Sequence, residues 1–248
     1  TDIILIMNKT VLITGASRGI GKQIAIIFAQ NGFNIVATCH NNIDTLSSLK
    51  NELSKYNVNI FLFQGDLSKQ STISNLIKFL KNNNISVDVL INNAGISVVG
   101  LIQDLSIDDW NYIWNTNVTA PIFLSKELVP HFLHNHSGKI INISSVWGNV
   151  GASCEVAYSA TKGAINSFTK ALAKELAPSN IQVNAISCGI IDTDMNSHLS
   201  SDDINEIVTA IPAGRIGTPK DIALTALSLV NGSDYLTGQI ITVDGGWI

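Results

Sequence analysis

Short apolar stretches alternate with helical stretches along this chain of 248 residues. The apolar stretches have the length and the β-branched content of buried strands. They cover residues 10–14, 34–38, 59–64, 88–91, 139–143, 181–187 and 239–243. Strands that alternate with helices pair in parallel, because each helical crossover returns the chain to the same end of the sheet. We therefore expect an α/β fold of one domain, residues 1–248, with helices on both faces of a parallel sheet.

Polar and helix-breaking residues mark where the expected helices begin and end. Asp44 and Ser68 are plausible N-caps, and Ser106 opens a long helical stretch that continues to about residue 134. Gly32 and Pro178 follow two other helical stretches and should end them.

The composition excludes several classes of protein. Only 14% of the residues are charged and the mean hydropathy is +0.27, which suits buried parallel strands or a large subunit interface. The net charge of −4 and the pI of about 5.6 argue against nucleic-acid binding. No apolar run approaches the ~20 residues of a membrane span.

The first residues and the cysteines point to the cytoplasm. The opening TDIILIM is too short for a signal peptide, and Met7 is a candidate start, which leaves it open whether residues 1–6 are native. Three widely spaced cysteines fit neither a disulfide framework nor a zinc site. The histidines of the run HFLHNH suit a helix end, so we expect no bound metal.

A glycine-rich turn, Gly15-Ala16-Ser17-Arg18-Gly19-Ile20-Gly21, joins the first strand to the first helix. Glycines allow a tight turn close to a pyrophosphate, and the helix N-terminus offers N–H groups and a positive dipole. The same residues also match GxSxG, the nucleophile turn of hydrolases. We favour the nucleotide site for three reasons. A hydrolase does not explain Gly21, no downstream Asp and His pair stands at strand ends, and the hydrolase turn should follow a strand well inside the sheet.

The residues after the second strand indicate which nucleotide is bound. NAD sites usually place a carboxylate there for the ribose hydroxyl, but residues 38–42 read TCHNN. Arg18 is available for a 2′-phosphate. We therefore expect NADP(H). The loop Asn92-Asn93-Ala94-Gly95 should border the cofactor if the first and fourth strands are neighbours, and the long segment with Ile191 and Thr193 should cover its nicotinamide.

Three side chains form a candidate acid–base group. Ser145 ends the fifth strand, and Tyr158 and Lys162 stand one helical turn apart. A nearby ammonium should lower the tyrosine pKa, and the serine hydroxyl should hold a carbonyl oxygen. The group would then deliver a proton to a nascent alkoxide.

Together these motifs resemble the classical short-chain dehydrogenase/reductase family over nearly the whole chain. The matching positions are Thr14, Gly15, Gly19, Gly21, Asp66, Asn92–Gly95, Asn117, Ser145, Tyr158, Lys162 and Asp244–Gly246. The resemblance implies a Rossmann-type, doubly wound, seven-stranded parallel sheet and a homotetramer. It implies an enzyme that reduces a ketone to a secondary alcohol, with Asn117 holding a water of the proton relay. It also implies the cofactor contacts Thr14, Gly15, Ser17, Arg18, Gly19, Ile20, Gly21, Asp66, Leu67, Asn93, Ala94, Gly95, Tyr158, Lys162, Gly189, Ile191 and Thr193.

Within the family the chain looks most like 3-oxoacyl-[acyl-carrier-protein] reductase of fatty acid biosynthesis, whose partner is acyl carrier protein. Residues 147–156 and the terminal Gly245-Gly246-Trp247 look instead like the reductase of the 5-aminopentanone modification on elongation factor P, where Glu155 would face a substrate amine. The family commonly has Pro-Gly where this chain has Cys188-Gly189, which leaves the shape of the lid entrance open. A non-catalytic nucleotide-binding protein is the alternative of another class.

Overall fold

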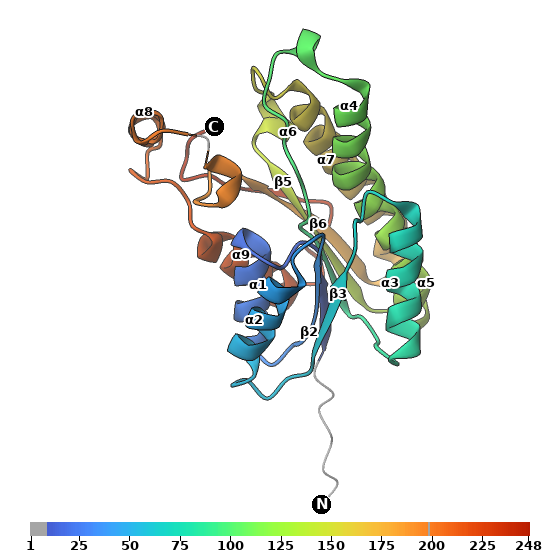
Figure 1. Ribbon diagram of the computed structural model, residues 1–248. Coiled ribbons are helices and arrows are strands. Elements are labelled where there is room, and N and C mark those ends of the chain that lie inside the picture. Colours follow the sequence, from blue (N-terminus) through green and yellow to red (C-terminus); the bar gives the residue numbers. More distant parts are fainter. Residues whose placement is uncertain (1–8, 198) are drawn as a thin grey trace, which may run out of the picture.

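A single parallel sheet of seven strands forms the centre of the molecule in the computed structural model, which describes residues 9–197 and 199–248 (Figure 1). The strand order is β3-β2-β1-β4-β5-β6-β7. The strands are β1 (Thr10–Ile13), β2 (Asn34–Cys39), β3 (Ile60–Gln64), β4 (Val89–Asn92), β5 (Gly138–Ser145), β6 (Ile181–Cys188) and β7 (Ile240–Val243). The expected doubly wound sheet is confirmed, and each expected strand is present to within two residues at either end.

Helices cover both faces of the sheet. Helices α1 (Gly19–Gln30), α2 (Ile43–Leu53) and α9 (Pro219–Asn231) lie on one face, and α3 (Gln70–Asn82), α5 (Ala120–Asn135) and α7 (Val156–Leu176) lie on the other (Figure 1). Along β1, Val11 and Ile13 enter the core on the first side, whereas Leu12 enters the core on the second. Side chains alternate along a strand, so an entirely apolar strand fills both cores.

Two expected N-caps are wrong. Asn42, not Asp44, caps α2, and its side chain accepts the N–H of Thr45. Helix α3 begins after Lys69, because Ser68 donates its hydroxyl to Asp66 instead of capping the helix. In both places several polar residues compete for the same N–H groups, and the neighbouring turn decides between them.

The stretch that begins at Ser106 is not one regular helix. Ser106 caps α4 (Ile107–Trp114), as expected, but the wider π turn η2 (Asn115–Thr119) precedes α5. Single π turns inside helices are frequent at functional sites. This turn contains Asn117, which the family resemblance singles out.

The carboxyl ends of β1 and β4 meet in the middle of the sheet, where the chain turns from one face to the other. Such a switch point is where ligands bind in open α/β sheets. Because β1 lies inside the sheet, our strand-position argument against a hydrolase is wrong. Gly21 still argues against a hydrolase, because α1 packs on the carbonyl oxygen of Gly15 only where residue 21 has no side chain, and a hydrolase does not explain this glycine.

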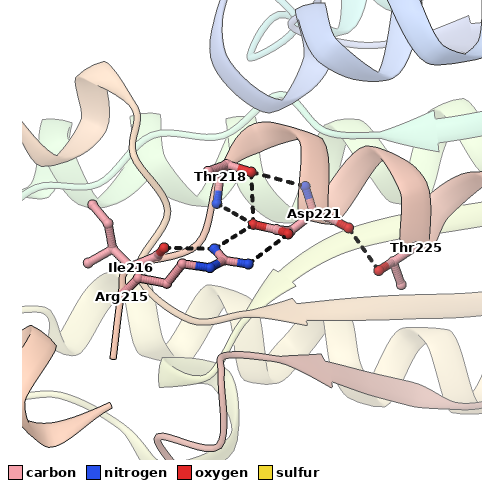
Figure 2. A network of polar contacts seen from close by, with 5 residues as sticks. All are labelled: Arg215, Ile216, Thr218, Asp221 and Thr225. Atoms are coloured by element: carbon pink, nitrogen blue, oxygen red, sulfur yellow. Dashed lines mark hydrogen bonds and ion pairs between the residues drawn. The ribbon is translucent and has the colours of Figure 1, made fainter. Parts of the chain in front are cut away.

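A polar network fixes the start of α9 (Figure 2). Two nitrogens of Arg215 donate to both oxygens of Asp221, at 2.9 and 3.0 Å. Thr218 and Asp221 form a capping box at the same helix end. The network holds the turn that leads back to Gly217, which pairs with Ile191 beside the site. Within residues 9–197 and 199–248, no helix combines the length and the apolar character required to cross a membrane.

Candidate active site

Backbone geometry makes the glycine turn a close-fitting cradle. Gly15 and Gly19 have φ of +66° and +54°, in the region that favours glycine. A Cβ on Gly21 would collide with the carbonyl oxygen of Gly15, so the first turn of α1 packs directly on the loop. A strand, a tight turn and a helix N-terminus in this order fit a pyrophosphate.

Thr14 and Asn93 join this cradle to the loop after β4. The hydroxyl of Thr14 accepts the N–H groups of Asn93 and Ala94, both at 2.9 Å. The side-chain amide of Asn93 donates in return to the carbonyls of Thr14 and Gly15, at 2.8 and 3.0 Å. The two loops therefore form one rigid unit. Residues 93 and 94, which we expected to contact the cofactor, first of all hold the glycine turn in place.

The segment after β6 closes the other side of the cradle. A Cβ on Gly19 would lie 3.3 Å from the methyl group of Thr193, so Thr193 leaves little room for a side chain at residue 19. Ile191 pairs with Gly217, and Gly189 hydrogen bonds to the end of β7. A cavity of about 500 Å³ lies between Gly19 and this segment, and residues 192–194 line part of its wall.

Charged side chains of both signs lie around the cradle. Arg18, the expected partner of a 2′-phosphate, forms an exposed ion pair with Asp194 at 3.1 Å. His40, at the end of β2, lies 3.7 Å from the carboxylate of Asp66. Burial raises the pKa of Asp66, but hydrogen bonds from Ser68 and the charges of His40 and Lys69 outweigh burial and leave it lowered.

Leu67 and Ile20 are placed differently from the other expected cofactor contacts. The side chain of Leu67 is buried in the core against α3 and α5, and that of Ile20 packs on the core of the opposite face. Only their backbone groups, or the exposed part of Ile20, remain for a ligand. Ser17 is half-buried in the glycine turn.

Lys162 and Tyr158 meet as their spacing predicted. The ammonium of Lys162 lies 5.4 Å from the centre of the Tyr158 ring and donates to the carbonyl oxygen of Ile143, at 2.8 Å. A Cβ on Gly95 would lie 3.5 Å from the same ammonium and 3.4 Å from Oδ1 of Asn117. The fold therefore brings β4, β5, the π turn and α7 together at one point.

The expected lowering of the Tyr158 pKa is wrong for this structure. Burial raises the pKa of Tyr158, the charges of Cys188 and Glu155 raise it further, and the Ser145 hydroxyl opposes them by hydrogen bonding. Burial lowers the pKa of Lys162 to about 8. A phenol with a raised pKa is fully protonated at neutral pH, which is the form that donates a proton.

Asn117 is held by three hydrogen bonds and is 1% exposed. Its Oδ1 accepts the N–H of Ile96 at 2.9 Å, and its Nδ2 donates to the Ile96 carbonyl and to Thr161 at 2.8 and 3.1 Å. The π turn thus binds the loop after β4 to α7 beside Lys162.

Sequence reasoning missed several supports of this site. The N–H of Trp147, the first residue of a short helix α6 (Trp147–Val150), donates to Oγ of Ser145 at 3.2 Å. Ser144 donates to Asn166, which donates to Asn149 of the same helix. The two pairs that contain Asn166 join residues 22 and 17 positions apart, so no local sequence pattern predicts them. Glu155 accepts the hydroxyl of Ser97 at 2.7 Å.

Comparisons with known proteins agree with this geometry. The family model described as short chain dehydrogenase matches residues 9–204. The uncharacterized oxidoreductase YmfI of Bacillus subtilis is 42% identical over 243 residues, which are 97% of this chain and 99% of that protein. The 3-oxoacyl-[acyl-carrier-protein] reductase FabG of Chlamydia muridarum is 38% identical, with 98% of each chain covered.

A solved structure has the same architecture. The NADPH-dependent reductase YwfH, involved in bacilysin biosynthesis, superposes with a TM-score of 0.91 at 27% identity, covering 97% of this chain and 98% of its own. The matched residues 9–204 include the glycine cradle, Asn117, Ser145, Tyr158 and Lys162. The chain belongs to the short-chain dehydrogenase family of oxidoreductases.

Proposed function

We propose that this protein reduces a ketone to a secondary alcohol with NADPH. The observation that carries the proposal is the convergence of Ser145, Tyr158 and Lys162 beside the glycine cradle. Gly15, Gly19 and Thr193 would hold the dinucleotide, and Arg18, now in an exposed ion pair with Asp194, would be available for its 2′-phosphate. When bound, the cofactor supplies the hydride.

The protein's own residues supply the proton and the orientation. Ser145 donates a hydrogen bond to the ketone oxygen and Tyr158 passes its phenolic proton to that oxygen, which becomes the hydroxyl. Lys162 is positively charged below pH about 8 and stabilises the phenolate that remains. Asn117, held in the π turn by its hydrogen bonds to Ile96, would anchor a water of the relay that returns a proton to Tyr158, as the family resemblance implies.

Replacing the phenol tests this assignment. Tyr158→Phe should lower kcat by about 10³-fold or more, because a positioned acid is lost, while the Kd for NADPH stays within about twofold. NADPH oxidation is followed by absorbance and cofactor binding by fluorescence. A Tyr158→Phe protein with wild-type kcat would refute the proposal. Binding of NADPH with no turnover on any ketone would favour the non-catalytic alternative.

For the substrate, one candidate is a 3-oxoacyl group on acyl carrier protein. Its support is the 38% identity to the FabG protein described above, with 98% of each chain covered. Acyl carrier protein is acidic, so docking should depend on cations at the rim of the site and should weaken with salt. The family resemblance implies a homotetramer, and the three widely spaced cysteines favour the reducing cytoplasm.

A second candidate is the 5-aminopentanone group on elongation factor P, and the geometry near Tyr158 favours it. Glu155 is half-buried, accepts the Ser97 hydroxyl, and is close enough to raise the Tyr158 pKa. A carboxylate in this position attracts a substrate ammonium and repels an anionic acyl carrier. The 42% identical YmfI carries no substrate in its name and is compatible with either candidate.

A competition assay separates the two candidates. Acetoacetyl-acyl-carrier protein and a protein or peptide that bears an aminoketone are offered in parallel with NADPH, to wild type and to Glu155→Gln. The amide keeps the Ser97 hydrogen bond and removes the charge. For an amine-bearing substrate, Glu155→Gln should raise KM about tenfold, and its KM for a neutral ketone should stay near wild type. Equal effects on both substrates would remove Glu155 from substrate choice.

A further inference from the structure

Two tryptophans far apart in the sequence meet beside Ser145. The rings of Trp147 and Trp247 lie edge to face, with centroids 5.2 Å apart and planes at 62°. Both side chains are half-buried, so each keeps an open surface. Edge-to-face pairs are favourable aromatic contacts, and an indole offers a large apolar face with little conformational entropy to lose.

Trp247 is held on a rigid mount. The carboxylate of Asp244 accepts the N–H groups of Gly246 and Ile248, both at 2.9 Å, which curls residues 244–248 into a tight turn. Gly245 and Gly246 have φ of +72° and +86°, so this turn requires glycine. The Gly245 carbonyl accepts the N–H of Ala213.

Close packing fixes the same turn against the end of β6. A Cβ on Gly189 would lie 2.7 Å from the Cβ of Asp244, and one on Gly245 would lie 2.9 Å from Ile211. These contacts leave the turn little freedom to move. The Trp247 indole is therefore preorganised before any substrate arrives.

Trp147 is also held firmly in place. Its backbone N–H donates to Oγ of Ser145, and its ring packs on the small core around Tyr158. The next residue, Gly148, lies so close to α7 that a Cβ there would be 2.7 Å from the carbonyl carbon of Lys162. The Trp147 ring thus stands beside the three residues that would act on the ketone.

We infer that Trp147 and Trp247 form the apolar wall of the substrate site, and that Trp247 is a specificity-determining residue. The carbons next to the ketone lie against the two indoles while the oxygen faces Ser145 and Tyr158. The inference rests on the proposed ketone reduction and adds where the substrate chain is held. The substrate class is a ketone with an alkyl chain of several carbons, and a smaller ketone such as acetone gains little from the wall.

Three variants test the wall. Trp247→Ala removes the indole, Trp247→Phe keeps an aromatic face, and Ile248→Ala changes the exposed neighbouring residue in the same turn. Trp247→Ala should raise KM for a 3-oxo alkyl substrate about threefold to tenfold, the range expected for one lost aromatic contact. Trp247→Phe should recover most of this loss, and Ile248→Ala should match wild type. The Kd for NADPH should not change in any of them.

A spectroscopic readout needs no substrate. Two coupled indoles give a paired band in the far-ultraviolet circular dichroism spectrum. Trp110 and Trp114, with ring centroids 5.3 Å apart, form a second pair that contributes to this band in every variant. The difference spectrum between wild type and Trp247→Ala, Trp247→Phe or Trp147→Phe should therefore show a paired band from Trp147 and Trp247. Such a difference band together with an unchanged KM for the alkyl ketone would overturn the inference. Absence of the difference band would show that Trp147 and Trp247 do not pair, which would overturn it as well. If the difference band is present but wild type turns over no ketone, the proposed function has failed instead.

Discussion

Helices α6 and α7 approach each other closely at Gly148, behind the candidate active site. In Gly148→Ala the new methyl carbon would lie 2.7 Å from the carbonyl carbon, 2.8 Å from the Cβ and 2.9 Å from the carbonyl oxygen of Lys162. Real Cβ atoms essentially never come within 3.0 Å of these atoms, and two of the three belong to the backbone. Either α6 or the Lys162 turn of α7 must therefore shift.

The size of the effect follows from this geometry. Overpacking a tight core contact costs about 1–3 kcal/mol. Because alanine has a higher helix propensity than glycine, the substitution also stabilises α6 by up to about 1 kcal/mol, which offsets part of this cost. The net loss of about 1–2 kcal/mol should lower Tm by about 2–8 °C for a chain of this size. A shift of Lys162 by a few tenths of an ångström to 1 Å should lower kcat by about 10- to 100-fold.

Gly163→Ala is the matched control, because it adds the same methyl group to the other side of the joint. A Cβ on Gly163 would meet only the carbonyl oxygen of Gly148, at an ordinary 3.5 Å. This change should raise Tm by about 2–4 °C, since alanine is the better residue inside α7. Thermal unfolding by circular dichroism and NADPH-dependent kcat are measured for both variants. Equal Tm values for the two variants, or a wild-type kcat for Gly148→Ala, would refute the argument.

Three further predictions concern other parts of the site. Thr14→Val leaves the N–H groups of Asn93 and Ala94 without their acceptor. The free energy of unfolding should therefore fall by about 2–4 kcal/mol, and the Kd for NADPH should rise. Thr14→Ser keeps the hydroxyl and should match wild type. Asp221→Asn should cost about 1–2 kcal/mol in denaturant unfolding. The lowered pKa of Asp221 means that its contribution is complete above the unfolded pKa of about 4 and disappears on acidification, so the variant and wild type should converge at low pH. Lys162 loses its proton above pH about 8, so kcat should fall there, and a profile flat to pH 10 would contradict this assignment.

The order of strands and helices could be read from the sequence because each element carries its own local pattern. Uniformly apolar strands, such as residues 139–143, are typical of a sheet covered on both faces, and β5 is covered in this way. The glycine turn and the Tyr158–Lys162 spacing are also local, so they could be recognised before the sheet was known. Helix caps were less certain, because Asn42 and Asp44 compete over three residues for the same role.

The sequence alone determined which chemical groups the site contains and on which strand, turn or helix each of them lies. Only the tertiary structure decided their environment. Burial, with Cys188 and Glu155 adding to it, raises the pKa of Tyr158, and the hydrogen bond with Ser145 does not offset this rise. Trp147 and Trp247, a hundred residues apart, became neighbours through packing at Gly148 and Gly189, where backbone approaches backbone. Such contacts depend on distances between segments in the folded protein, which a local sequence pattern does not predict.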